Sequence, residues 1–241
     1  MNWTLLYIVA SLAIIPIMIY GAISQSSVHS VFNKYSKVYS EQGITAGELA
    51  RKLLKQAGIN NVDVVPIEGR LSDCYDPTHR VVKLSHSTYN VSSMAALGVC
   101  AHEIGHAIQH HRRNFMFRLR SFLVPVVNLV SRACLPLILI GSLLGFTFYI
   151  PTVGYYIVLA SVISYGASML FYLVTLPLEY DASRKALKLL KETGEFSNSE
   201  VHAAKQVLTA AIHTYIAAFM TSLAYFLRFL SYAMIFTRNR D

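Results

Sequence analysis

Residues 133–178 have the sequence ACLPLILIGSLLGFTFYIPTVGYYIVLASVISYGASMLFYLVTLPL, which contains no Asp, Glu, Lys or Arg. At about 1.5 Å per residue, one helix of this length would exceed the hydrocarbon core of a bilayer, which is roughly 30 Å thick. Tyr149-Ile-Pro-Thr-Val-Gly154 combines Pro and Gly near the middle of the stretch and favours a turn there. We therefore expect residues 121–178 to form a transmembrane hairpin, with one helix beginning near Phe122 and the other covering about residues 153–176.

Two further apolar stretches lie towards the ends of the chain. Trp3–Ile23 carries no charge, and no Lys or Arg precedes it, which favours a retained transmembrane anchor over residues 1–24 rather than a cleaved signal peptide. Ile212–Phe236 predicts a fourth span within the C-terminal segment 207–241, although Arg228 interrupts it and the span can also end just before that arginine. The composition, 54% hydrophobic and 14% charged, is typical of a membrane protein.

The positive charges are concentrated in two segments. The net charge is +8, and most Lys and Arg lie within Lys34–Arg120 and Arg184–Lys205. Four spans place both segments on one side of the membrane, which the positive-inside rule identifies as the cytoplasm. This explanation is simpler than nucleic-acid binding, which we do not expect. The three cysteines are odd in number and form no CxxC pair, so we expect neither a disulfide framework nor a cysteine-based metal site.

The polar residues 25–120 predict a small α+β unit that packs on the membrane helices. Thr45-Ala-Gly-Glu48 is a capping box that begins a helix, and Ser92 or Ser93 can cap a second helix. Residues 70–78 have loop chemistry. The predicted elements are helices over residues 45–57 and 93–111 and strands over residues 61–67 and 80–85. Residues 179–206 are expected to add a cytoplasmic helical segment.

His102-Glu-Ile-Gly-His106 is an HExxH motif in the second of these helices. Side chains at positions i and i+4 share a helix face, so the imidazoles of His102 and His106 can reach one Zn²⁺ with Glu103 beside them. Zinc lowers the pKa of a bound water towards about 7, and Glu103 is expected to take its proton as a general base and deliver it to the leaving amine. The alternative is a helix end with solvated histidines.

Zinc needs a third protein ligand, and the next histidines along the helix are poor candidates. His110 would lie about 6 Å further along the helix axis than His106, and no turn-forming glycine follows His106. Residues 110–113 are better explained as a basic helix end near lipid headgroups.

Glu179 is the better candidate for the third ligand. It lies where the third span leaves the membrane, so its carboxylate can face the HExxH helix. An interfacial acid paired with a nearby Lys or Arg is the alternative, and Asp181 is the rival ligand. Ser183 lies one helical turn after Glu179 and can hydrogen-bond a ligand.

Four stretches of the chain carry a resemblance to a known family: residues 69–77, 95–110, 176–184 and 207–218. Together they resemble the YugP-type neutral zinc metallopeptidases of membranes. It implies a mostly α membrane protein of about four transmembrane helices with a small zincin-like (gluzincin) cytoplasmic unit, holding one Zn²⁺ per chain through two His and a downstream Glu. The chain is more distantly similar to the HtpX-type and CAAX-prenyl-type membrane proteases, whose third ligand opens a Glu-x-x-Ala-Asp pattern. Glu179 matches that glutamate, and Ser183 stands in the place of the Asp.

Two positions depart from the family pattern. Cys74 stands where the family usually has a histidine, and it can contact the site, switch it, or be a packing substitution. His213 stands where an apolar residue is usual. Tyr180, Arg184 and His213 are the candidates for stabilising the transition state.

The sequence therefore predicts a multi-pass zinc metalloendopeptidase of a bacterial-type cell membrane, with its active site on the cytoplasmic side. We expect it to act on peptides or proteins, including membrane proteins, and the strand over residues 80–85 is expected to be a sheet edge that binds extended peptide. The alternative is a non-catalytic metal-binding membrane scaffold, against which Glu103 argues because a structural site has no use for that carboxylate. A transporter is disfavoured because Arg132 and Arg228 have no acidic partner in a span.

Overall fold

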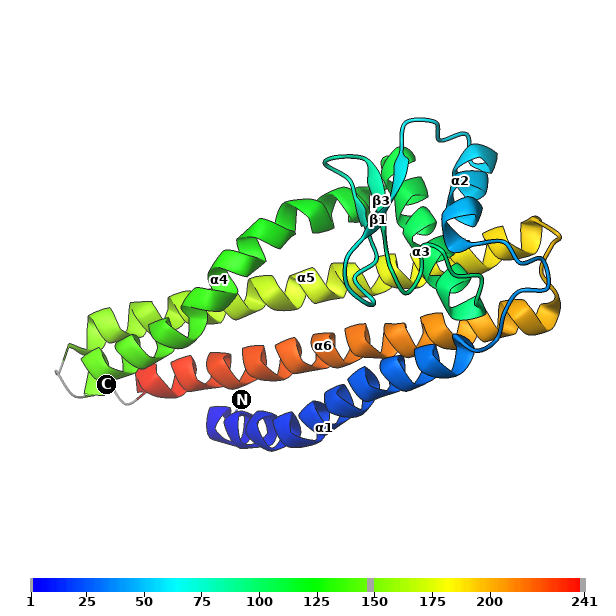
Figure 1. Cartoon of the computed structure of the whole chain (residues 1–241). Coiled ribbons are helices and arrows are strands. Elements are labelled where there is room, and N and C mark those ends of the chain that lie inside the picture. Colours follow the sequence, from blue (N-terminus) through cyan, green and yellow to red (C-terminus); the bar gives the residue numbers. More distant parts are fainter. Residues whose placement is uncertain (1, 147–149, 239–241) are drawn as a thin grey trace. The chain divides into compact units, whose positions relative to one another are not determined.

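The protein is mostly helical, with one small three-stranded sheet (Figure 1). The structure is a computed structural model that describes residues 2–146 and 150–238. Three helices in this part of the chain are long and apolar enough to cross a membrane by length and composition: Trp3–Tyr35, Thr152–Glu192 and Asn198–Ile235. The predicted mostly α membrane protein is confirmed at this level.

The elements are α1 (Trp3–Tyr35), α2 (Ala46–Gln56), β1 (Asp63–Ile67), β2 (Cys74–Asp76), β3 (Val81–Ser85), α3 (Met94–His111), α4 (Phe115–Phe146), α5 (Pro151–Glu192) and α6 (Asn198–Arg238).

The helices of the polar segment begin at the capping residues that the sequence predicts. The Thr45 hydroxyl accepts a hydrogen bond from the backbone N–H of Glu48, whose carboxylate accepts one from the backbone N–H of Thr45 at 2.9 Å. α3 begins after Ser93, whose hydroxyl accepts from the backbone N–H of Ala96 at 3.3 Å. In both cases a side chain satisfies a backbone donor that the first helical turn leaves without a partner.

The structure describes the two helices of the predicted hairpin, α4 and α5. α4 continues through Pro125 and Pro136 to Phe146, and α5 begins at Pro151, a position where the missing N–H of proline costs no helical hydrogen bond. The predicted turn includes residues 147–149, which lie outside the described residues, as do residues 239–241 of the predicted C-terminal tail.

The sheet differs from the prediction in one respect. The expected loop over residues 70–78 contains β2, which pairs antiparallel with β3, while β1 pairs parallel with β3 on the other side. The prediction that the strand over residues 80–85 is a sheet edge is therefore wrong, because β3 lies between β1 and β2. β2 is instead an edge strand, and its Tyr75 lies opposite Val82.

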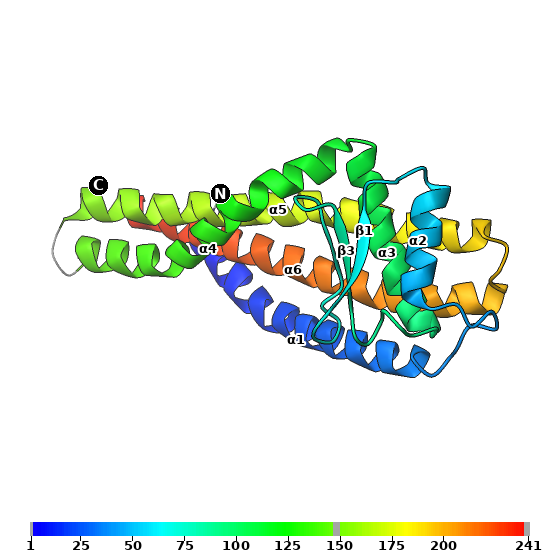
Figure 2. The same cartoon turned by 45° about the horizontal axis from the view of Figure 1, so that its top comes forward.

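The chain forms two compact units. The first comprises Met1–Ile23, Leu119–Leu176 and Tyr215–Asp241, and the second comprises Ser24–Arg118 and Pro177–Thr214. The predicted segment boundaries at residues 24, 120, 178 and 206 stay predictions. The second unit contains the sheet, α2, α3, the C-terminal part of α5 and the N-terminal part of α6. In both views α2 and α3 lie beside the yellow-to-orange turn between α5 and α6 (Figures 1 and 2).

Glycines on α3 allow close helix packing in the second unit. A Cβ built on Gly105 would lie 2.7 Å from the backbone oxygen of Ala182 on α5. A Cβ built on Gly98 would lie 3.1 Å from the Cβ of Ala204 on α6. The other buried residues of α3 are mostly small or aliphatic and include Leu97, Ala101 and Ile104. The backbone of α3 can therefore approach α5 only because residue 105 has no side chain.

We expect Gly105→Ala to lower the free energy of unfolding by about 1–3 kcal/mol, because the added methyl group must displace a helix backbone rather than a flexible side chain. Thermal unfolding in detergent, followed by circular dichroism, measures this. Gly21→Ala on α1 is the matched control, because its Cβ would meet the Cβ of Ala217 at an ordinary 3.8 Å. Equal stability of the two variants would contradict the close approach.

Candidate metal centre

Three side chains that can bind a metal converge between α3 and α5. His102 and His106 lie one turn apart on α3, with ring centroids 4.7 Å apart. Glu179 projects from α5, and its Oε2 atom lies 3.1 Å from His102 Nε2 and 3.4 Å from His106 Nε2. The potential ligand atoms of all three residues lie within 4.8 Å of one another. The structure thus brings together the two histidines and the carboxylate that the sequence predicted as ligands.

The two separations around Glu179 Oε2 fit a single zinc ion. Tetrahedral zinc binds His nitrogen and carboxylate oxygen at about 2.0–2.2 Å, so neighbouring ligand atoms lie about 3.3 Å apart. The separations of 3.1 and 3.4 Å around Glu179 Oε2 match that value. Glu179 is only 1% exposed, and a carboxylate so buried requires a compensating positive charge.

A buried glutamine sets the orientation and the tautomer of His106. Gln109 Oε1 lies 2.9 Å from His106 Nδ1. The amide nitrogen of Gln109 donates to the backbone oxygen of Leu178 at 3.0 Å and to Asp181 Oδ2 at 2.8 Å. With its nitrogen committed to two acceptors, the amide presents its oxygen to the imidazole, so Nδ1 of His106 is the protonated nitrogen. The lone pair of Nε2 then faces Glu179, as a metal ligand requires.

His102 is held in a similar way by Ser183. Ser183 is buried, and its hydroxyl lies 3.2 Å from Nδ1 of His102, which is one of the predicted ligands. Asp181, the rival third ligand, instead accepts from Gln109 and Lys185. Both imidazoles therefore turn their Nε2 atoms towards the Glu179 carboxylate, and this set of lone pairs suits zinc.

Glu103 lies on the neighbouring face of α3, beside the sheet. The residue is 8% exposed, and its Oε2 atom accepts a hydrogen bond of 2.7 Å from the backbone N–H of Tyr75 on β2. Burial raises the pKa of the Glu103 carboxyl to about 7, against the opposing effect of His102. A carboxyl group with a pKa near neutrality can both accept and donate a proton in that range.

The structure also describes the surroundings of the four remaining candidates from the sequence. Cys74 on β2 is exposed as a residue but its thiol is partly desolvated, and this desolvation, followed by the charge of Glu103, raises the pKa of the thiol. Tyr180 is 60% exposed and lines a cavity of about 440 Å³ along α5 and α6 together with Arg184. His213 is exposed on α6. The roles proposed for these four residues stay predictions.

Sequence reasoning missed two residues that contact the site. Gln109 follows His106 by three residues and therefore shares its helix face, which is a signal that could have identified it. Tyr75 contacts Glu103 through its backbone, and no side-chain pattern could have revealed that contact.

The comparisons with known proteins agree with this geometry. The model of a family described as "Putative neutral zinc metallopeptidase" matches residues 10–234. A protein of Bacillus subtilis (strain 168) named "Putative membrane protease YugP" is 39% identical over 218 residues, which cover 90% of this chain and 92% of that protein. No solved structure matches the chain.

We expect Gln109→Leu to weaken zinc binding by about 10- to 100-fold, because the partner that fixes the His106 ring is lost. Competition with a chromogenic chelator measures the affinity, and circular dichroism checks that the variant is folded. Gln56→Leu, the same substitution at an exposed position on α2, is the control. A folded Gln109→Leu protein that binds zinc as tightly as the wild type would refute the positioning role.

Proposed function

The chain belongs to the family described as "Putative neutral zinc metallopeptidase", and from this premise we propose that it is a membrane-embedded zinc endopeptidase. The observation that carries the proposal is the convergence of two imidazole nitrogens on Glu179 Oε2, at 3.1 and 3.4 Å, next to the buried carboxyl of Glu103. His102, His106 and Glu179 would hold one zinc ion per chain. A zinc ion bound there supplies a Lewis acid that polarises the peptide carbonyl and the attacking water.

Glu103 is the proposed general base. The Tyr75 N–H holds one oxygen of its carboxylate, which fixes the orientation of the other oxygen. That oxygen can take a proton from the attacking water and later give it to the leaving amine. A buried carboxylate held by one backbone donor needs little rearrangement to do this, because its orientation is already set.

Peptides or proteins are the proposed substrates, and β2 is the element proposed to bind them. β2 is an edge strand, and the N–H of Tyr75 points to Glu103 rather than to β3. An extended peptide that pairs with this edge of β2 through main-chain hydrogen bonds would lie next to Glu103, and it would use main-chain groups other than the Tyr75 N–H, which already donates to Glu103. This proposal takes the place of the peptide-binding edge that the sequence predicted at residues 80–85.

We further propose that the protein crosses a bacterial-type cell membrane four times. Three spans are supported by the long apolar helices within α1, α5 and α6. The fourth is proposed for α4, which has 32 residues and contains the apolar segment Leu135–Leu144. The zincin-like second unit, which carries most of the positive charge, is proposed to lie in the cytoplasm.

We expect Glu103→Gln to keep zinc and lose peptide hydrolysis, because the ligands remain and only the base is replaced. Glu179→Ala and His102→Ala are expected to lose both zinc and activity. Metal analysis and cleavage of an unfolded membrane protein in detergent measure the two properties. Glu192→Ala, at the end of the same helix as Glu179, is the control that should keep both.

Two results would contradict these assignments. Full zinc occupancy in Glu179→Ala would remove it as the third ligand. A zinc-loaded wild type without hydrolytic activity would instead favour the non-catalytic metal-binding scaffold, for which Glu103 has no role.

The topology makes a separate prediction. Alkaline phosphatase fused within residues 193–197, between α5 and α6, is expected to be inactive because that turn faces the cytoplasm. The same enzyme fused at the C-terminus is expected to be active. Activity measured in whole cells decides between the two orientations, and the reverse pattern would place the metal centre outside the cell.

A further inference from the structure

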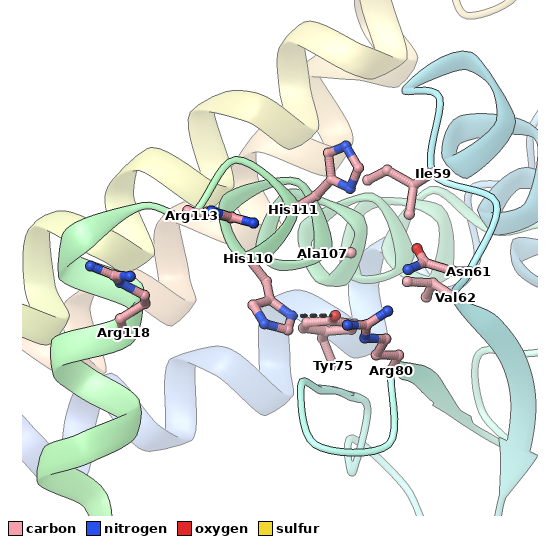
Figure 3. A pocket seen from close by; sticks show the side chains of 10 residues that line it. All are labelled: Ile59, Asn61, Val62, Tyr75, Arg80, Ala107, His110, His111, Arg113 and Arg118. Carbon is pink, nitrogen blue, oxygen red and sulfur yellow. Dashed lines mark hydrogen bonds between the residues drawn. The ribbon is translucent and has the colours of Figure 1, made fainter.

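A second cavity lies beside the candidate metal centre, within the same compact unit. It has a volume of about 440 Å³ and is bordered by the sheet, the C-terminal half of α3 and the start of α4 (Figure 3). The residues that matter for its chemistry are Tyr75, Arg80, His110, His111, Arg113 and Arg118.

The lining of this cavity is strongly cationic. Three arginines and two histidines contribute to it, and no Asp or Glu does. Within residues 2–146 and 150–238, none of Arg80, Arg113 and Arg118 forms an ion pair with a carboxylate. In Figure 3 Arg113 and Arg118 lie on one side of His110 and Arg80 on the other. Guanidinium groups arranged around a cavity without a counter-charge favour an anion that accepts several hydrogen bonds.

Two of these arginines occupy backbone positions that favour glycine. Arg80 and Arg113 have φ angles of +54° and +52°. Arg113 follows the C-cap of α3, where its N–H donates to the His110 oxygen at 2.9 Å and the N–H of Asn114 donates to the Gln109 oxygen at 3.0 Å. Glycine is the common residue at such a position because it adopts a positive φ without steric cost. Replacing either arginine by glycine therefore removes a charge while relieving the backbone.

Tyr75 connects the cavity to the proposed catalytic group. Its backbone N–H donates to Glu103, and its hydroxyl is hydrogen-bonded to His110 Nδ1 at 2.8 Å. The His110 ring in turn stacks on Phe117, with centroids 5.4 Å apart. His110 follows Glu103 by seven positions on α3, which is about 10 Å along the helix axis. An extended peptide advances about 3.3 Å per residue, so the cavity lies within about three residues of a peptide bond held at Glu103.

We propose that this cavity is a substrate subsite that binds a carboxylate of the peptide, two or three residues from the bond that is cleaved. The carboxylate comes from an acidic side chain or from a free C-terminus, since both present the same planar acceptor to a guanidinium group. The inference rests on the proposed peptidase function and names the class of substrate for that site.

Binding to the full-length Glu103→Gln protein in neutral detergent tests the subsite without requiring catalysis. Three fluorescent peptides of otherwise equal sequence are compared: a neutral one with an amidated C-terminus, one with a single internal Glu, and one with a free C-terminal carboxylate. We expect at least one of the acidic peptides to bind about tenfold more tightly than the neutral one, and the preference to fall as salt is added. The acidic peptide that is preferred identifies the source of the carboxylate.

Arg113→Gly, Arg80→Gly and the double variant, each made in the Glu103→Gln protein, test which residues carry the preference. Each single variant is expected to reduce it to about threefold, and the double variant to abolish it, with unfolding temperatures unchanged or higher. Arg51→Ala, which removes an arginine on α2 outside the cavity, is the control and is expected to keep the preference. Equal binding of all three peptides, or a preference that survives in the double variant, would overturn the proposal.

Anionic lipid added to the same detergent separates a peptide subsite from a lipid site. Mixed micelles containing phosphatidylglycerol that displace the acidic peptide, through an interaction lost in Arg113→Gly, would assign the cavity to a lipid headgroup and overturn the proposal. Displacement by excess acidic peptide but not by these micelles supports it. Arginine-dependent peptide binding without any cleavage by the zinc-loaded wild type would refute the peptidase function while leaving the carboxylate site in place.

Discussion

The contact between two imidazoles on α3 and one buried carboxylate on α5 is the constraint on which the site depends. Glu179 lies 77 residues beyond His102 in the chain, yet their side-chain atoms are 3.1 Å apart. This approach requires the backbones of α3 and α5 to come close, and Gly105 makes it possible by offering no side chain opposite Ala182. The same glycine lies within the motif, between Glu103 and His106, so one stretch of chain supplies both candidate histidine ligands and the space for the helix that carries Glu179.

A chain of hydrogen bonds, which begins at the buried His106 and ends at the partly exposed Asp181 and Lys185, holds this arrangement. The imidazole contacts Gln109, the amide of Gln109 contacts Asp181, and Asp181 contacts Lys185 at the surface of α5. In a medium of low polarity such a network is strong when every member has a partner and costly when one is removed. The network therefore orients the His106 ring and also joins α3 to α5, which links the geometry of the candidate site to the stability of the unit.

The edge strand of the sheet contributes to the site through both its backbone and a side chain. Tyr75 on β2 donates its backbone N–H to Glu103 and places its phenol against His110. One residue thus lies between the proposed base and the cationic cavity. Extended peptide paired with β2 would pass both, so the small sheet supplies a direction for the substrate as well as a wall of the site.

Local spacing was sufficient for the sequence to determine several parts of this protein. The apolar runs predicted the long helices, the capping residues Thr45 and Ser93 predicted where α2 and α3 begin, and the i, i+4 spacing predicted that His102 and His106 share a face. Each of these depends on residues within one or two helical turns. The tertiary structure alone decided that β2 forms in an expected loop and pairs with β3, that Asp181 turns to Gln109 rather than to the histidines, and that three arginines border one cavity. These outcomes depend on contacts between elements far apart in the chain, where the packing of backbones rather than the pattern of nearby residues selects the partner.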